Sequence, residues 1–148
     1  MLQAPSSSAL CNSGVNGQLS LNGMRILVVD DDHNTLEMLS ELLSSYDADV
    51  KTAESVPTAL KIYRSWAPEL LLSDLGMPEQ DGYDLIRNIH ALPYGLLRKA
   101  IAITGFSRDE DRERALAAGY DIFLTKPVDL EQLINLIAET NSPQGSAE

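Results

Sequence analysis

The chain has 148 residues, which leaves room for one globular domain and excludes two full ones. Its 11 Lys and Arg against 22 Asp and Glu give a formal net charge of −11, which disfavours binding to nucleic acid or to anionic lipid. The sequence has a single cysteine, no run of about 18 apolar residues and no signal-peptide pattern, and it therefore predicts a cytoplasmic protein without membrane insertion.

The two ends of the chain differ in composition from the middle. Residues 1–23 carry no charged side chain and are rich in Ser, Asn and Gly, which leaves little apolar surface to offset the entropy of the chain. The last residues, 142–148, are also poor in large apolar side chains. We therefore expect a folded domain over 24–141 between a disordered tail or linker at 1–23 and a second tail at 142–148.

Within this domain, short apolar runs alternate with longer segments of helical periodicity. The run 26–29 has no polar alternation, as expected of a strand covered on both faces, and the runs 70–72, 101–103 and 122–124 repeat this pattern. We expect these four runs to be central strands. Segment 49–52 alternates in character, which is typical of an edge strand.

The segments between the strands carry apolar residues at spacings of three and four, which predicts amphipathic helices. The clearest are 36–46, 56–63, 85–89 and 130–137. Segment 108–118 is mostly charged, so we expect this helix to bury little beyond Ala115 and Leu116, to be the least firmly docked, and to end at Gly119. Alternating strands and helices of this kind form a doubly wound α/β sandwich, a five-stranded parallel sheet between two layers of helices.

Acidic residues follow two of the expected central strands. Asp30, Asp31 and Asp32 come directly after the first run, and Asp74 follows the run 70–72. With the strand order 2-1-3-4-5, the first and third strands are neighbours, and ligands bind beyond their carboxyl ends. Crowded carboxylates repel one another unless a cation joins them, and Mg²⁺ prefers such oxygen ligands.

Simpler roles exist for these residues. All three aspartates after the first strand are also good helix caps, and we expect that role for Asp32. For Asp30 and Asp31, the second acidic strand end at Asp74 favours a cation site. His33 beside them is more typical of an exposed side chain than of a transition-metal ligand.

Two further polar residues, Thr104 and Lys126, follow the remaining central strands. Taken singly, Thr104 is equally consistent with a helix cap and Lys126 with a counter-ion. Together with the carboxylates they describe a phosphoryl-transfer site. In such a site a carboxylate accepts the group, a divalent ion and an ammonium neutralise its oxygens, and a hydroxyl donates a hydrogen bond to it.

This ordered set of residues resembles the receiver domain of two-component response regulators. The resemblance covers nearly all of 24–140, and its motifs lie at 27–32, 74–82, 104–105 and 126–127. It implies the flavodoxin-like fold with strand order 2-1-3-4-5. It also implies that Asp74 is the phosphoacceptor, that Asp30 and Asp31 form the acidic pair of a Mg²⁺ site, and that Gly76 lends its backbone carbonyl to the ion.

The resemblance assigns roles to the later motifs as well. Lys126 is expected to contact the phosphoryl group, and Pro127 to shape the loop, commonly through a cis bond. Thr104 and Phe123 are expected to be the switch pair, whereas the spacing of Tyr120 from Lys126 does not fit. Because Phe123 has no hydroxyl, its part in the switch must come from ring packing.

The resemblance implies a signalling domain that catalyses only its own aspartyl phosphorylation and dephosphorylation. Its expected partner is a sensor histidine kinase or a histidine phosphotransfer protein, and a homodimer through the fourth helix, fifth strand and fifth helix is an option. The motif at 73–78 is similar to receivers of hybrid sensor kinases, and a free-standing regulator or phosphate shuttle is almost as consistent. Haloacid-dehalogenase-type phosphatases also use aspartyl phosphate and Mg²⁺, but 30–34 lacks the Thr or Val of their motif.

Overall fold

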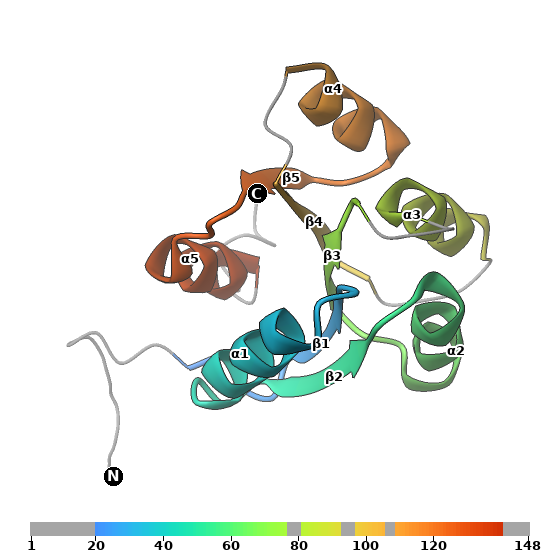
Figure 1. The fold of residues 1–148 in the computed structure, drawn as a ribbon. Coiled ribbons are helices and arrows are strands. Elements are labelled where there is room, and N and C mark those ends of the chain that lie inside the picture. Colours follow the sequence, from blue (N-terminus) through green and yellow to red (C-terminus); the bar gives the residue numbers. More distant parts are fainter. Residues whose placement is uncertain (1–19, 77–80, 93–96, 106–108, 141–148) are drawn as a thin grey trace, which may run out of the picture.

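The computed structural model describes residues 20–76, 81–92, 97–105 and 109–140, which form a parallel sheet between two layers of helices (Figure 1). The strands are β1 (Arg25–Val29), β2 (Asp49–Ala53), β3 (Leu70–Asp74), β4 (Lys99–Thr104) and β5 (Ile122–Thr125). Their order is β2-β1-β3-β4-β5 and every neighbouring pair is parallel, so the predicted topology is confirmed.

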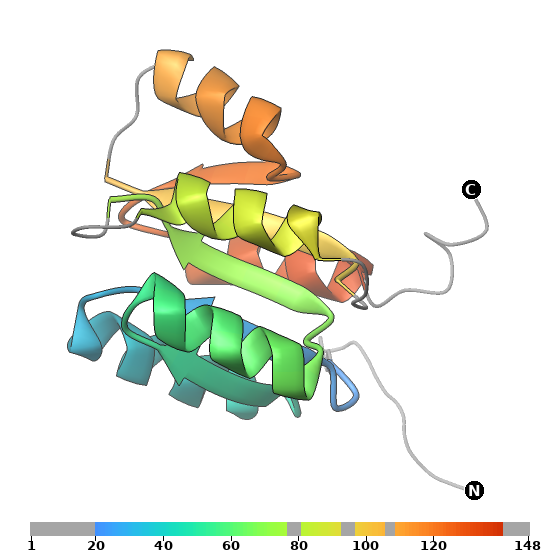
Figure 2. The same ribbon diagram turned by 90° about the vertical axis from the view of Figure 1, so that its right-hand side faces the viewer.

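Five helices connect the strands on the two faces of the sheet. They are α1 (His33–Ser44), α2 (Val56–Trp66), α3 (Gly82–Ala91), α4 (Asp109–Ala118) and α5 (Leu130–Thr140). Helices α1 and α5 cover one face, and α2 and α3 cover the other, with α4 beyond them at the β5 end (Figures 1 and 2). None of the helices in the described ranges has the length and apolar character needed to cross a membrane.

The sheet divides the apolar core into two clusters. Along β1, Leu27 and Val29 pack on the α2 and α3 side, whereas Ile26 and Val28 pack on the α1 and α5 side. Successive side chains of a strand point to opposite faces, so a strand covered on both faces needs an unbroken apolar run. This explains why the run 26–29 predicted its strand so well.

The fifth strand corrects one prediction. The apolar run 122–124 predicted a central strand, whereas the strand order 2-1-3-4-5 placed the fifth strand at an edge. β5 is that edge, and its apolar residues are half-buried. Among the described strands, β5 pairs with β4 alone, and helices flank it (Figure 1). The apolar run therefore indicated that helices cover the two faces of the strand. It did not indicate whether the strand lies at the centre or at the edge of the sheet.

The fold also begins earlier than predicted. Leu21, which composition assigned to the tail 1–23, is fully buried in the α1 and α5 cluster. Its N–H donates to the carbonyl of Tyr46 at 2.7 Å, and that of Gly23 donates to Asp47 at 2.7 Å. One leucine in a polar segment is too weak a signal for composition to detect. The remainder of that tail, residue 141 and the tail 142–148 lie outside the described residues.

Helix α4 is the least firmly docked helix, as expected from its sequence. Ala115 is its one buried side chain, while Leu116, which we expected to be buried, is 39% exposed. Gly119 ends the helix at φ +130°, and a Cβ there would lie 2.5 Å from the ring of His90. A glycine is therefore needed both for the backbone conformation and for the close approach of α3.

Candidate functional site

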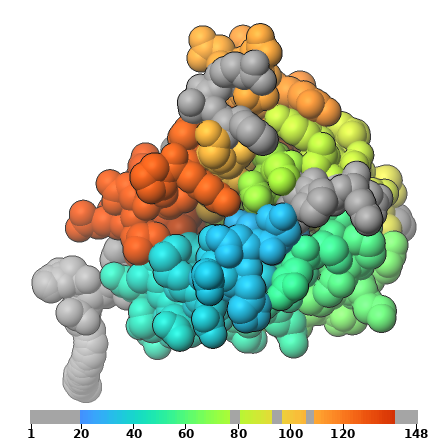
Figure 3. Space-filling model, in the orientation of Figure 1, coloured from blue at the N-terminus to red at the C-terminus, as the bar shows by residue number. Residues whose placement is uncertain are grey.

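The two acidic strand ends lie side by side at the carboxyl edge of the sheet. Strands β1 and β3 pair in parallel with Val29 opposite Ser73, so Asp30 and Asp74 follow at the same level. One carboxylate oxygen from each of Asp30, Asp31 and Asp74 lies within 4.8 Å of the other two. In the space-filling view, segments from the start, middle and end of the chain meet on this face (Figure 3).

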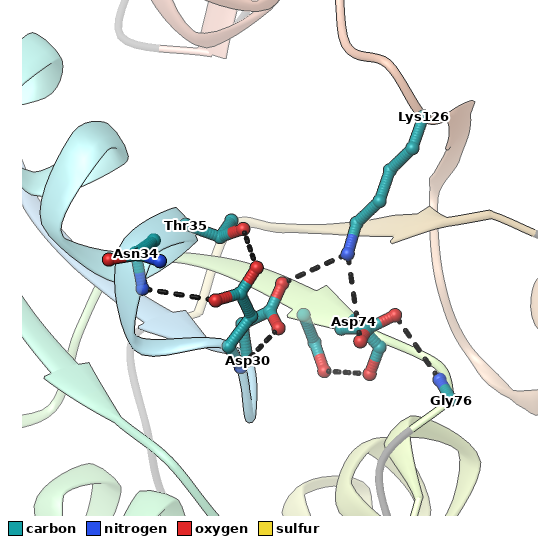
Figure 4. Close-up of polar contacts among 8 residues, drawn as sticks. Asp30, Asn34, Thr35, Asp74, Gly76 and Lys126 are labelled. Carbon is teal, nitrogen blue, oxygen red and sulfur yellow. Dashed lines mark hydrogen bonds and ion pairs between the residues drawn. The ribbon is translucent and has the colours of Figure 1, made fainter.

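Lys126 reaches the carboxylates from the loop after β5. Its Nζ lies 3.2 Å from Oδ2 of Asp30 and 3.7 Å from Oδ2 of Asp74 (Figure 4). The backbone N–H of Lys126 donates to the carbonyl of Thr104 at 2.7 Å, which holds this loop against the end of β4. The Lys126–Pro127 peptide bond is cis, as the resemblance implied.

Asp30 is a buried carboxylate that is only partly compensated. It is 3% exposed and accepts a hydrogen bond from the N–H of Asp32 at 2.9 Å. Burial raises the pKa of Asp30, and the charge of Asp74 raises it further, against the opposing effects of the Asp32 N–H and of Lys126. Asp30, Asp31 and Asp74 place three carboxylates beside the ammonium of Lys126, so this edge carries net negative charge when all four groups are ionised.

The pKa of Lys126 is also raised, but here the raised pKa favours the charged form of the side chain. Burial alone disfavours the ammonium of Lys126, but the charges of Asp74 and Asp30 outweigh it, and the pKa of Lys126 lies above its ordinary value. Lys126 therefore carries a positive charge at neutral pH and faces both carboxylates.

Asp74 is held at the end of β3 with its two carboxylate oxygens in different environments. Oδ2 faces Lys126, while Oδ1 accepts a hydrogen bond from the N–H of Gly76 at 3.2 Å. The residue is 8% exposed. The resemblance implied that the carbonyl of Gly76 is a ligand of the ion. The structure shows in addition that the N–H of Gly76 orients the carboxylate of Asp74.

Asp32 and His33 lie outside this cluster. Asp32 caps α1, accepting from the N–H of Asn34 at 3.1 Å and from the hydroxyl of Thr35 at 2.9 Å, and the Thr35 bond is the main cause of its lowered pKa. His33 is exposed, and its Nδ1 lies 3.0 Å from a carboxylate oxygen of Glu54. The predicted Asp32 cap is confirmed, and the imidazole of His33 contacts Glu54 rather than the aspartate cluster.

The two expected switch residues lie on the same face of the sheet. Thr104 is the fully buried last residue of β4, and Phe123 is half-buried against the α2 and α3 cluster. Ala102 pairs with Phe123, so Thr104, two residues further along β4, projects to the same side. Met77 and Pro78, which belong to the motif at 74–82, and Phe106, which follows the motif at 104–105, lie outside the described residues.

Sequence reasoning missed one group beneath the site. Tyr120 was set aside because its spacing does not fit the switch pair, yet its buried hydroxyl donates to the carbonyl of Gly82 at 2.8 Å. Gly82, the last residue of the motif at 74–82, has no room for a side chain, because a Cβ would lie 2.6 Å from the carbonyl oxygen of Asp74. No motif in the sequence links these residues.

The fold and the site together define a class of protein, a flavodoxin-like domain with an acidic, lysine-capped crevice at the topological switch point of its sheet. Residues 26–138 match the family model of the response regulator receiver domain, and the chain belongs to this family of two-component signalling domains.

Similar proteins occur alone and within longer chains. The chain is 43% identical over 120 residues to an uncharacterised 14.6 kDa protein of Leptolyngbya boryana, covering 81% of this chain and 92% of that protein. It is 36% identical over 119 residues to the sensor histidine kinase RcsC of Salmonella typhi, covering 80% of this chain but only 12% of the kinase. A solved CheY-like receiver domain protein of Methanospirillum hungatei JF-1 has a TM-score of 0.75 at 29% identity, covering 88% of this chain and 99% of that one.

Membership of the family sets the general role of the domain. Receiver domains are signalling domains that interact with histidine kinases or phosphotransfer proteins and bind Mg²⁺ through a cluster of acidic residues. The chain is thus a signalling domain rather than a classical enzyme, which removes the phosphatase alternative.

Proposed function

We propose that this domain accepts a phosphoryl group on Asp74 from a phosphohistidine of a sensor kinase or a phosphotransfer protein. The observation that carries the proposal is the meeting of three carboxylates and one ammonium from separate loops at a single edge of the sheet. Carboxylates placed together in this way repel one another and cost stability, so such a cluster marks a candidate functional site.

Asp30, Asp31 and Asp74, with the carbonyl of Gly76, would hold a Mg²⁺ ion. The residues fit this ion because one carboxylate oxygen from each of the three aspartates lies within 4.8 Å of the other two, and because these three carboxylates outnumber the ammonium of Lys126 beside them. When bound, the ion neutralises the charge on the transferring phosphoryl group.

The side chains of Asp74, Lys126 and Thr104 take direct part in the transfer. An oxygen of Asp74 attacks phosphorus, the P–N bond to the donor imidazole breaks with its electron pair going to nitrogen, and that nitrogen takes a proton from solvent. Lys126 neutralises the phosphoryl oxygens, and the Thr104 hydroxyl donates to one of them. Hydrolysis reverses the state when water attacks phosphorus and the bond to Asp74 breaks.

The new charge at Asp74 changes the surface that partners recognise. The Thr104 hydroxyl moves toward the phosphoryl group, and the Phe123 ring fills the space that it leaves. The face formed by α4, β5 and α5 then changes its preference between partners, including a second copy of the chain. The weak docking of α4 supports this assignment, because such an element shifts at low cost.

Intact mass spectrometry after treatment with acetyl phosphate and Mg²⁺ tests the acceptor. Wild type gains one acid-labile phosphoryl group, and Asp74→Asn gains none. Asp49→Asn, the same change at an exposed carboxylate on β2, serves as the matched control and behaves as wild type. Absence of the adduct on wild type, or an undiminished adduct on Asp74→Asn, contradicts the proposal.

Both arrangements of the domain have support among the relatives. The 92% coverage of the Leptolyngbya protein favours a free-standing regulator, and the similarity to RcsC favours a receiver within a hybrid kinase. Of the two we propose the free-standing regulator, because the higher identity belongs to the short relative. The sequence of the surrounding gene tests this choice.

A further inference from the structure

Two buried hydroxyl groups lie beneath the proposed phosphorylation site and have no part in the proposed function. Ser73 is 1% exposed, and its Oγ donates to the carbonyl of Asp74 at 3.1 Å. Tyr120 is 3% exposed, and its hydroxyl donates to the carbonyl of Gly82 at 2.8 Å. A buried polar group is kept where its hydrogen bonds hold a particular arrangement.

The first residue of α3 is pressed against the backbone of the phosphoacceptor. The N–H of Gly82 donates to the carbonyl of Leu75 at 3.2 Å. A Cβ on Gly82 would lie 2.6 Å from the carbonyl oxygen of Asp74 and 3.0 Å from Cα of Leu75. Because no space separates the two segments, a shift of the 74–75 backbone must displace the start of α3.

The same start of α3 is connected to α4. Tyr120 comes directly after the glycine that ends α4, and its N–H donates to the carbonyl of Ala115 within that helix at 3.1 Å. On the other side of the α3 start, the guanidinium of Arg114 lies 3.9 Å from the ring centroid of Tyr83. With one buried side chain of its own, α4 depends on these contacts for its position.

We propose that the Tyr120 hydroxyl is a positioning group that couples the state of Asp74 to α4 through the carbonyl of Gly82. This inference rests on the proposed function and names the regulatory connection of that same site. The connection runs from the 74–75 backbone to Gly82, from Gly82 to Tyr120, and from Tyr120 into α4.

The chemistry of Tyr120 suits this role. Burial raises the pKa of its hydroxyl, so the group remains a neutral donor at physiological pH. Phe123, the aromatic residue of the expected switch pair, has no hydroxyl to offer. Tyr120 thus supplies a directional bond where the ring of Phe123 supplies only packing.

Removal of the hydroxyl alone tests the coupling. Tyr120→Phe keeps the ring, and Tyr46→Phe is the matched control, because Tyr46 follows α1 at the opposite edge of the sheet. Amide hydrogen exchange of 109–118 is measured for wild type and both variants, free and saturated with beryllofluoride and Mg²⁺, with saturation verified by ¹⁹F NMR. Thermal unfolding of each variant reports on the fold.

Wild type and Tyr46→Phe change the exchange of α4 on binding beryllofluoride. In Tyr120→Phe this difference between free and bound protein shrinks by about two- to tenfold, the equilibrium effect of one hydrogen bond. An undiminished difference at saturation overturns the coupling and leaves the proposed function intact. Failure of wild type to bind beryllofluoride contradicts the proposed function itself.

A second measurement needs no variant. In protein carrying ¹³C at Cζ of tyrosine, the Tyr120 resonance shifts when beryllofluoride and Mg²⁺ bind, because its hydrogen bond to Gly82 changes, whereas the Tyr46 resonance stays in place. If the Tyr120 resonance does not shift on binding, the coupling is contradicted, even if Tyr120→Phe does not fold.

Discussion

The centre of the sheet and its β5 end are built differently. Every residue of β3 is buried and β1 is buried from its second residue on, whereas the apolar residues of β5 are half-buried and α4 buries one side chain. Asp30 and Asp31 follow β1 and Asp74 ends β3, both buried strands at the centre of the sheet, and the face proposed for partner recognition lies over the weakly packed end. A site that must hold charges in fixed positions benefits from the first environment, and an element that must move benefits from the second.

Two leucine-to-alanine substitutions, one in each region, should differ most in their effect on the free energy of unfolding. Leu71→Ala on β3 removes a fully buried side chain, and we expect it to lower the free energy of unfolding by about 2–5 kcal/mol. Leu116→Ala on α4 removes a side chain that is 39% exposed, and we expect a change within about 0.5 kcal/mol. Urea unfolding measures both, and similar losses for the two variants contradict the comparison.

Removal of the lysine tests the chemistry of the acidic site, which Lys126 reaches from the loop after β5. Lys126→Ala leaves Asp30 and Asp74 without their ammonium partner, and the phosphoryl oxygens lose the same charge. We expect the rate of phosphorylation by acetyl phosphate to fall by about 10²–10³-fold, the usual effect of deleting one electrostatic contact to a transition state. Lys51→Ala on β2 is the control, and a rate equal to wild type in Lys126→Ala excludes this role.

Acid–base behaviour of Asp30 gives a smaller effect with a defined sign. Its pKa is raised in the folded state, so the folded protein favours the protonated form. The stabilisation from Asp30 is present below the unfolded pKa of about 4 and is lost as the pH rises through the folded value. In EDTA, Asp30→Asn should therefore gain stability relative to wild type as the pH rises, until the difference levels off.

Unfolding by urea at a series of pH values checks this sign. Asp49→Asn, at the exposed edge strand, is the matched control. A wild type that gains stability relative to Asp30→Asn as the pH rises contradicts the account. Addition of Mg²⁺ should stabilise wild type and have less effect on Asp30→Asn, because the variant lacks one carboxylate of the pair.

The smallest effect concerns the docking of α4. Arg114→Ala removes the guanidinium over the Tyr83 ring, a contact of about 0.5–1 kcal/mol for exposed sites. We expect faster amide exchange confined to α4, with little change in the denaturant midpoint of the whole domain. Arg112→Ala, on the same helix, is the control, and equal exchange in the two variants rules out a docking role for the Tyr83 contact.

Much of the architecture was predictable because its causes are local. The unbroken run 26–29 predicted a strand covered on both faces, and Asp32 before a helical stripe predicted a cap that the structure contains. The approach of Asp30 to Asp74 followed from strand order, since the carboxyl ends of neighbouring parallel strands meet. The roles of Asp74, Thr104 and Phe123 in phosphorylation stay predictions for the experiments above.

By itself, the sequence determined the alternation of strands and helices, the acidic strand ends and the weak docking of α4, because periodicity, capping and charge act over a few neighbouring residues. Only the tertiary structure decided that Leu21 belongs to the core and that the Tyr120 hydroxyl reaches Gly82. These contacts join segments distant in the chain, and their energies depend on packing geometry that no local pattern encodes.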